Sequence, residues 1–277
     1  DGAFSEAVRI PLQKPGRYTV CLSSQVGCAM QCAFCATGRL GLTRNLATWE
    51  ILAAFCTVRD EAVADGGRVT GAVFMGQGEP LHNYDHVLQA ASVLSDPAGG
   101  RVASENITIS TVGLVPAIRR YTREGHPYRL IVSMTSALPE KRAKLLPVAG
   151  RTDLAELVDA LRERAAATRD RVTVAWVVMG GVNTDDDEVA ALHAALDGIP
   201  ARINLIDVND ARPDGFRRAT VEELERFRDG LQALHVPIVR RYSVGNEQNS
   251  ACGMLAGRAR EEAGQPLRAA EATEPSA

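Results

Sequence analysis

The stretch Cys28-Ala-Met-Gln-Cys32-Ala-Phe-Cys35 places three thiols on one short segment with the spacing C-x3-C-x2-C. Cysteine thiolates are the usual ligands of iron–sulfur clusters. Three of them on one loop can hold a [4Fe–4S] cluster and leave its fourth iron open to a small molecule. A structural zinc site is the alternative, but it normally needs a fourth Cys or His, and the next His downstream is His82. The spacing therefore predicts a [4Fe–4S] cluster held by Cys28, Cys32 and Cys35.

The composition around this loop is that of a globular protein. The 277 residues are 45% apolar and 23% charged, which suits one large core. No apolar run approaches the roughly 20 residues of a membrane span, and we expect no signal peptide. The chain has six cysteines, and its close trio favours metal ligation in a reducing compartment over a disulfide framework. We expect a cytoplasmic protein without a membrane segment.

The charge distribution gives little support for a surface that wraps nucleic acid. The formal net charge is −3, whereas such proteins usually carry a basic balance or patch. One local group of arginines is a candidate patch, but glutamates at 222, 223 and 225 interleave with it, which is typical of a solvated helix face. Its members are Arg212, Arg217, Arg218, Arg226 and Arg228.

Apolar, β-branched runs alternate with amphipathic stretches along the chain. The expected strands are 18–22, 70–75, 106–110, 129–134, 172–178, 202–206 and 237–241. The expected helices are 48–64, 84–94, 154–168, 185–196 and 221–234, the first of them with Thr48 as its N-cap. This alternation predicts an α/β fold with a parallel sheet, either open or closed into a barrel. We expect an N-terminal extension over 1–17, a core over 18–262 and a disordered tail over 263–277.

A second motif, Met75-Gly76-Gln77-Gly78-Glu79-Pro80, follows the expected strand 70–75. A glycine-rich turn at the carboxyl end of a strand lets the backbone approach a ligand closely, and Glu79 can accept hydrogen bonds from an ammonium group. The same residues also suit an ordinary strand-to-helix turn with a surface glutamate. The position of the motif, one strand after the thiol loop, favours the ligand site.

Together, these two motifs resemble the radical S-adenosylmethionine (SAM) superfamily, in which SAM chelates the open iron and yields a 5′-deoxyadenosyl radical. Further segments resemble the RlmN/Cfr family of radical SAM methyltransferases, which methylate an adenine ring carbon of 23S ribosomal RNA. The matching segments run in family order at 6–11, 21–28, 36–38, 44–46, 78–80, 110–113, 203–206 and 251–253. The resemblance implies a partial (β/α)6 barrel, two SAM molecules per turnover, an electron donor such as flavodoxin or ferredoxin, and a monomer.

The resemblance also implies which residues contact SAM. Ser133 and Thr135 stand where the family usually has Ser-Leu-His, and Asn209 stands at an Asn that usually precedes a Pro. The full expected set of SAM contacts is Gly78, Glu79, Ser110, Ser133, Thr135 and Asn209.

Three further residues take catalytic roles by the same resemblance. Cys252 would accept a methyl group from a first SAM, and a methylene radical formed on that S-methyl group would add to an sp2 carbon of the substrate. Cys21 would then resolve the adduct by forming a disulfide with Cys252, and Glu6 would accept the ring proton. Without the resemblance, the sequence predicts that Cys21 and Cys252 are buried apolar thiols and that Glu6 is a surface residue. Cys56 is also expected to be a buried apolar thiol. Arg240 and Arg241 are the candidates for lowering the pKa of Cys252.

The sequence departs from the family in four places. The accessory N-terminal domain that helps to hold RNA is absent from this chain, and the segments 76–80, 133–136 and 245–255 differ from the family pattern. The chemistry is therefore better supported than the substrate. The leading hypothesis is methylation of adenine C2 in ribosomal RNA, with transfer RNA as a further substrate. The alternatives are the same chemistry on a small molecule or peptide, and a non-catalytic iron–sulfur or regulatory RNA-binding protein.

Overall fold

One curled, mixed sheet organises the computed structural model, which describes residues 2–168, 170–209, 215–241 and 254–255. Its strands, in spatial order, are β1 (Val8–Pro11), β2 (Arg17–Cys21), β5 (Arg68–Phe74), β6 (Ile107–Thr111), β7 (Arg129–Ser133), β8 (Val172–Val178), β9 (Ala201–Asp207) and β10 (Ile238–Arg241). β1 pairs antiparallel with β2, and every other neighbouring pair is parallel. The parallel strands follow the order of the chain, as β–helix–β crossovers produce.

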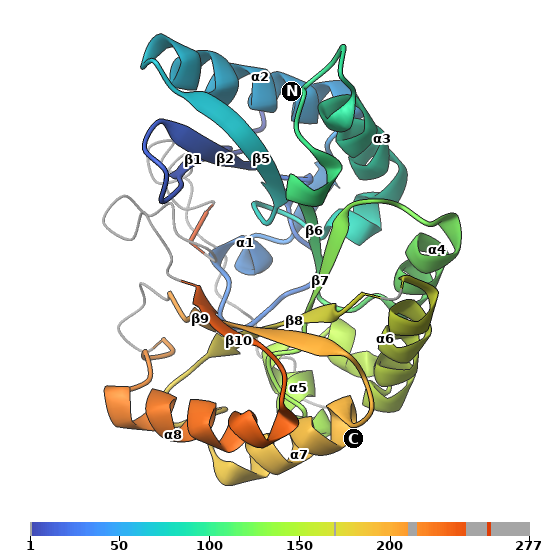
Figure 1. Ribbon diagram of the computed structural model, residues 1–277, viewed down its shortest axis with the longest axis vertical. Helices are drawn as coiled ribbons and strands as arrows, with labels where there is room; N and C mark the ends of the chain where they lie inside the picture. Colours follow the sequence, from blue (N-terminus) through green and yellow to red (C-terminus); the bar gives the residue numbers. More distant parts are fainter. Residues whose placement is uncertain (1, 169, 210–214, 242–253, 256–277) are drawn as a thin grey trace.

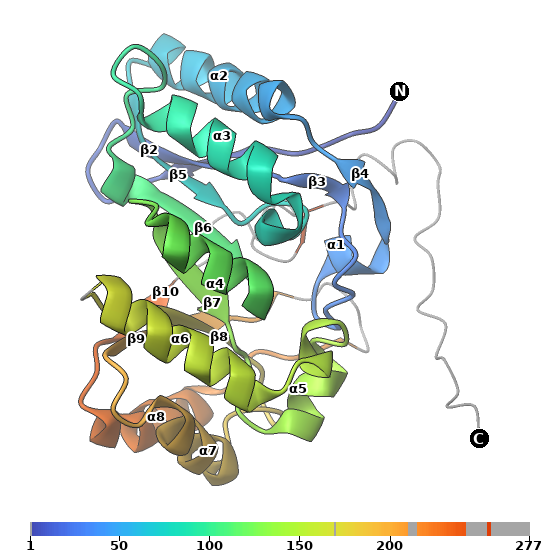
Figure 2. The same ribbon diagram turned by 90° about the vertical axis from the view of Figure 1, so that its right-hand side faces the viewer.

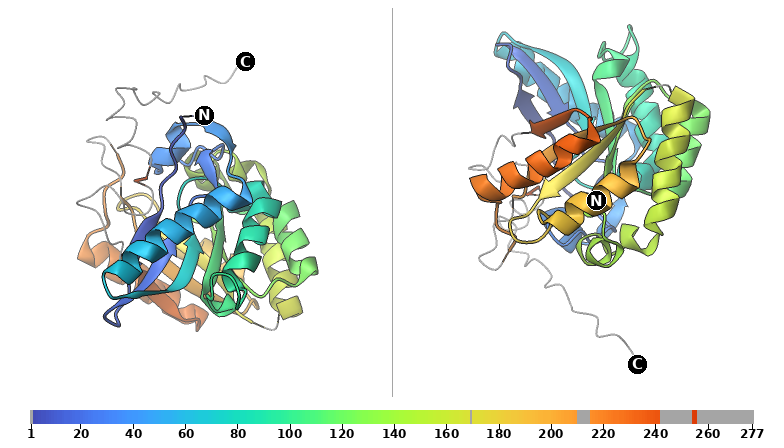
Figure 3. Two further views of the ribbon diagram at one scale, coloured as in Figure 1. Left: turned by 90° about the horizontal axis from the view of Figure 1, so that it is seen from above. Right: turned by 60° about the horizontal axis from the view of Figure 1, so that its bottom comes forward.

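Helices cover the convex side of this sheet (Figure 1). They are α2 (Thr48–Ala64), α3 (Tyr84–Ser95), α4 (Val115–Glu124), α6 (Leu154–Thr168), α7 (Asp186–Leu196) and α8 (Val221–Leu231). The views in Figure 3, from above and from below, show them on the outer side of the curl. The predicted α/β fold is thus confirmed as a half-barrel in which six parallel strands, β2 to β9, are extended by β1 and β10 at its edges.

Alternation along the strands gives the sheet two apolar faces. In β8, Val174 and Trp176 are fully buried in the main core beneath the helices, whereas Ala175 and Val177 line a cavity on the concave face. Successive side chains of a strand point to opposite faces, so one apolar run serves both layers. This arrangement explains why the strands read as near-continuous apolar segments.

A small unit closes the carboxyl ends of the strands (Figure 2). It consists of the hairpin β3 (Gln25–Gly27) and β4 (Leu42–Asn45), the short helix α1 (Ala36–Arg39) and, nearby, α5 (Pro139–Leu145). A second apolar cluster lies here, formed by Cys28, Met30 and Cys32 with Leu145, Leu146 and Met179. The thiol loop is therefore packed against the barrel rather than suspended from it.

Several details differ from the sequence predictions. α2 begins at Thr48, but its N-cap is Ala47, whose N–H donates to the Glu50 carboxylate at 2.8 Å. The helix expected over 221–234 ends at Leu231 and continues as a 3-10 turn over Gln232–Leu234. β1 lies within the expected extension 1–17, so the sheet begins before residue 18.

Some expectations lie beyond what the structure describes. Cys252, Arg212 and the expected tail fall outside the described residues. Within the described ranges, no helix combines the length and the apolar composition needed to cross a membrane.

Gly27 holds the hairpin beneath the thiol loop, and we predict that Gly27→Ala strongly lowers the free energy of unfolding. Gly27 has φ +76°, and an added Cβ would lie 1.9 Å from the Gly41 oxygen. Gly125→Ala is the matched control, because Gly125 has φ +68° but open space around it. We expect about 1 kcal/mol of left-handed strain at Gly125 and about 2 kcal/mol more from crowding at Gly27. Equal urea midpoints for the two variants would contradict this packing.

Candidate active site

A cavity of about 530 Å³ occupies the concave face of the half-barrel. That volume is within the usual range for small-molecule sites. Most residues predicted for the site line it, namely Cys21, Cys28, Cys32, Cys35, Gly78, Glu79, Ser110, Ser133 and Asn209. They come from positions far apart in the sequence because the carboxyl ends of parallel strands meet at one end of a sheet.

The thiol loop is fixed by backbone hydrogen bonds on both sides. The N–H of Cys28 donates to the Gly41 oxygen at 2.9 Å, and the N–H of Ala33 donates to the Leu145 oxygen at 3.0 Å. Gly38 comes so close to the loop that an added Cβ would lie 2.9 Å from the Cys32 nitrogen. These contacts position the three cysteines before any ligand binds.

The surroundings of these thiols suit an iron–sulfur cluster. Burial raises the pKa of Cys28 to about 12 and that of Cys32 well above its ordinary value, so a bound cation is required to keep them as thiolates. Among the described residues, no three His, Cys, Asp or Glu side chains are grouped to hold a single metal ion. A [4Fe–4S] cluster binds each thiolate through a different iron, which demands wider spacing than one ion does. The residues present fit the cluster.

Glu79 places a buried carboxylate in the same cavity. It is 2% exposed and accepts hydrogen bonds from the N–H groups of Leu81 and Val112, each at 2.9 Å. Burial raises the pKa of Glu79 to about 7, although the bonds from Val112, Thr111 and Leu81 oppose that rise. A cationic ligand group would complete this environment by restoring the charged form.

The turn that carries Glu79 requires its glycine. Gly78 has φ +99°, and an added Cβ would lie 2.6 Å from both the Ser24 hydroxyl and the Gln25 side chain. Gln25 is fully buried. It accepts from the Glu79 N–H at 2.9 Å and donates to Asn45 at 2.7 Å. The hairpin and the Gly78–Glu79 turn therefore form one rigid unit.

The remaining cavity-lining predictions lie at the ends of other strands. Ser110 is in β6 and Ser133 ends β7. Asn209 follows β9, is 7% exposed and accepts a hydrogen bond from Arg218 at 2.6 Å. These positions can surround a ligand that sits on the thiol loop.

Two predicted residues lie outside the lining of the cavity, and a third lies outside the described residues. Thr135 is fully buried, with φ +62° and a hydroxyl that has no partner among the described residues, and it does not line the cavity. Glu6 is half-buried and does not line it either, although its backbone oxygen accepts from the Ser23 hydroxyl at 2.6 Å. Cys252 is outside the described residues, but Leu255 lines the cavity.

Other expected residues have clear structural surroundings. Cys21 ends β2 and is 5% exposed. Cys56 is half-buried against the main core rather than fully buried. Arg240 pairs with Asp207 at 2.9 Å, and Arg241 lines the cavity.

Sequence reasoning missed two polar residues. Asn204 lines the cavity, and its buried Oδ1 has no partner among the described residues. The sequence feature that could have identified it is a carboxamide inside the apolar strand 202–206. Arg142 is 2% exposed and donates to the backbone oxygens of Val112, Ser133 and Met134. It joins the carboxyl ends of β6 and β7, and no local pattern marks it.

Comparisons with known proteins agree with this geometry. Residues 22–194 match the model of the Radical SAM superfamily. A protein of Anaeromyxobacter sp. named probable RNA methyltransferase is 55% identical over 94% of this chain and 76% of its own length. The dual-specificity RNA methyltransferase RlmN of Syntrophobacter fumaroxidans is 41% identical over 92% of this chain and 73% of its own.

Solved structures agree as well. A radical SAM methyltransferase from Sphaerobacter thermophilus superimposes with a TM-score of 0.86 at 38% identity, over 91% of this chain and 74% of that one. SuiB of Streptococcus suis, at 10% identity and a TM-score of 0.57, shares the fold. The chain therefore belongs to the radical SAM superfamily and, within it, to the methyltransferase family that includes RlmN.

Proposed function

We propose that this enzyme methylates C2 of an adenine in ribosomal RNA, and in transfer RNA, through an S-methyl group carried by Cys252. The observation that supports this most is the common cavity, which contains the thiol loop, Glu79 and Cys21. The RlmN relatives are named dual-specificity RNA methyltransferases, which supports RNA as the substrate. The chain itself would act in the cytoplasm as a monomer.

The segment just after Cys252 supports its role. Leu255, three residues later, is buried against the cavity, and its backbone oxygen accepts from the Thr37 hydroxyl at 2.7 Å. Thr37 belongs to α1, next to the thiol loop. Because three residues span at most about 11 Å, a thiol at 252 is within reach of a substrate bound in this cavity.

The target carbon explains why a radical is needed. C2 of adenine lies between two nitrogens and is electrophilic, so it does not attack the methyl group of SAM. When bound on Cys28, Cys32 and Cys35, the reduced cluster with SAM supplies a 5′-deoxyadenosyl radical. Glu79 would bind the ammonium group of SAM, with Ser110, Ser133 and Asn209 around the rest of the molecule.

Cys252 and Cys21 would then perform covalent catalysis, which divides one hard step into easier ones. Cys252 attacks the methyl group of a first SAM, and S-adenosylhomocysteine leaves. The 5′-deoxyadenosyl radical would take one hydrogen atom from the S-methyl group, and the methylene radical left on Cys252 would bond to the ring carbon. This adduct would return one electron to the cluster that Cys28, Cys32 and Cys35 would hold, and Glu6 would accept the ring proton. Cys21 attacks the Cys252 sulfur, and the freed carbon takes a proton to become the product methyl group. An electron donor such as flavodoxin or ferredoxin would supply the electron to the cluster that Cys28, Cys32 and Cys35 would hold.

We predict that Cys21→Ala traps a covalent adduct between Cys252 and the substrate, because the resolving thiol is missing. Mass spectrometry of the protein after turnover with unmodified 23S ribosomal RNA should show a nucleotide on the peptide that contains Cys252. Cys56→Ala is the matched control, since Cys56 lies outside the cavity, and it should turn over normally. If Cys252 carries neither a methyl group nor an adduct, the S-methyl mechanism is wrong.

A second prediction concerns pH and SAM affinity. Because the pKa of Glu79 is raised to about 7, its carboxylate becomes protonated below that pH and loses its attraction for an ammonium group. The dissociation constant of SAM, measured by equilibrium dialysis on the cluster-loaded enzyme, should rise as pH falls, by about tenfold per unit well below the pKa. Glu79→Gln should bind weakly with a flat profile. A flat profile for the unsubstituted enzyme would contradict the role of Glu79.

A further inference from the structure

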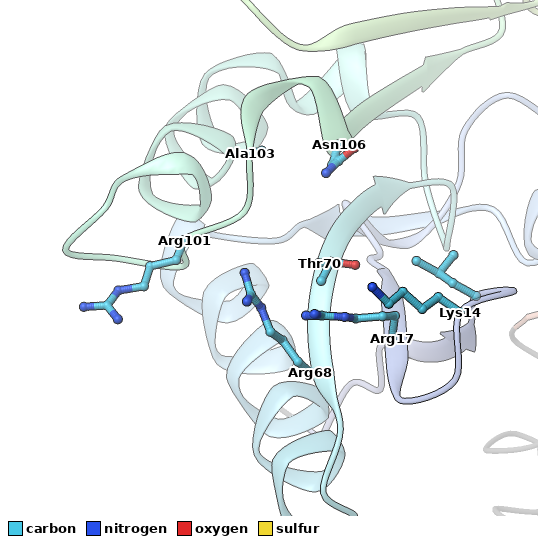
Figure 4. Close-up of a pocket in the computed structure, with 8 residues that line it drawn as sticks. Lys14, Arg17, Arg68, Thr70, Arg101, Ala103 and Asn106 are labelled. Carbon is cyan, nitrogen blue, oxygen red and sulfur yellow. The ribbon is translucent and has the colours of Figure 1, made fainter.

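A second cavity, of about 450 Å³, lies at the amino ends of the strands, opposite the thiol loop. We call it the basic cavity. Figure 4 shows Lys14 and Arg17 reaching into it from the β1–β2 side and Arg68 from the start of β5, while Arg101 points outward. The other lining residues are Leu12, Thr70, Ala103 and Asn106. None of these described lining residues is acidic, so the cavity concentrates positive charge.

No acidic side chain among the described residues neutralises the charges of the basic cavity. Across the described ranges, no ion pair involves Lys14, Arg17, Arg68 or Arg101. Other surface arginines do have acidic partners, such as Arg9 with Asp65 at 2.6 Å. Like charges gathered without partners repel one another and attract anions, so this cavity is suited to an anionic ligand.

The basic cavity continues into the candidate active site. Leu12, Thr70 and Asn106 line both cavities. Arg129, at the start of β7, lines the larger one and extends the basic rim. Arg202 lies two residues before Asn204 in β9, hence on the same face of the strand, and its buried Nε has no partner among the described residues. The concave face thus runs from cations at one end to thiols at the other.

We propose that the basic cavity binds phosphates of the RNA backbone, and that the target nucleotide enters the active site from this end of the half-barrel. The inference rests on the proposed function. Enzymes that modify a base must take it out of its stack and into a pocket. Phosphate contacts from Lys and Arg supply most of the affinity and set the register of the RNA. The juxtaposition of a cationic rim and a deep cavity meets both needs.

An acidic electron-transfer protein is a less suitable occupant. Arg68 is the first of the seven residues of β5, and the turn near the thiol loop follows the last of them. At about 3.3 Å per residue, the strand spans about 23 Å. A donor docked at the basic cavity would be remote from the cluster, whereas a phosphate bound there would be at the mouth of the cavity that receives the base.

The arginines of α8 and the loop before it are a weaker site for RNA. Arg217 pairs with Glu223 at 2.6 Å, and Arg228 lies 3.7 Å from Asp229. Their charges are therefore partly neutralised, as the interleaved glutamates predict. Arg226 is exposed on the same helix and offers a matched control.

The test compares Lys14→Gln/Arg68→Gln with Arg226→Gln in the full chain. Binding of fluorescein-labelled, unmodified 23S ribosomal RNA fragment is measured by anisotropy over a range of NaCl concentrations. The slope of log affinity against log salt should fall in magnitude by about 2 for the double variant, about 1 for each lost contact, and should not change for Arg226→Gln.

In methylation assays, the double variant should raise the KM for RNA more than it lowers kcat. SAM cleavage by dithionite-reduced enzyme without RNA reports whether each variant is folded and loaded.

Three results would overturn the inference. The first is a double variant that cleaves SAM normally and keeps the salt slope and the KM for RNA. The second is loss of RNA affinity in Arg226→Gln alone, which would place the RNA on α8. The third is a double variant that binds RNA normally but whose cluster is reduced more slowly by flavodoxin, which would assign the basic cavity to the electron donor. An unsubstituted enzyme that methylates no RNA would instead refute the proposed function.

Discussion

The hydrogen bonds to the buried carboxylate of Glu79 are the interactions on which the site depends. Burying a charge is costly unless hydrogen bonds and an opposite charge compensate it. The N–H groups of Leu81 and Val112 supply part of that compensation and, in doing so, join the turn after β5 to the end of β6. A cationic ligand would supply the rest, so the residue that joins the strand ends is also the one that we propose binds the ammonium group of SAM.

Arg142 is the complementary case, because it bonds to the backbone oxygen of Val112, the residue whose N–H bonds to Glu79. Its buried guanidinium donates to backbone oxygens at the ends of β6 and β7, and burial lowers its pKa to about 10. The carboxyl ends of the strands are therefore held by polar bonds, while apolar packing holds the helices to the convex face. This division lets the concave face remain open for ligands without loosening the sheet.

The sequence predicted most strands and helices within one or two residues, because each strand is an apolar run with both faces covered. It missed β1, which is short and ends in Pro11, and the β3–β4 hairpin, whose residues have little apolar pattern. It also missed the helices α1, α4 and α5. The thiol loop and the Gly78–Glu79 turn could be predicted from the sequence because their residues are neighbours in the chain. Arg142, Asn204 and the basic cavity were not, since Lys14, Arg68 and Arg101 meet only in the folded sheet.

The central claim is that the transferred carbon passes through a methylene on Cys252. The most direct measurement is mass spectrometry of nucleosides from unmodified 23S ribosomal RNA after turnover with SAM that carries a trideuterated methyl group. Removal of one hydrogen atom from the S-methyl group, followed by protonation from solvent, predicts 2-methyladenosine with two deuterium atoms in the new methyl group. A product that retains all three would show direct methyl transfer and contradict the role of Cys252.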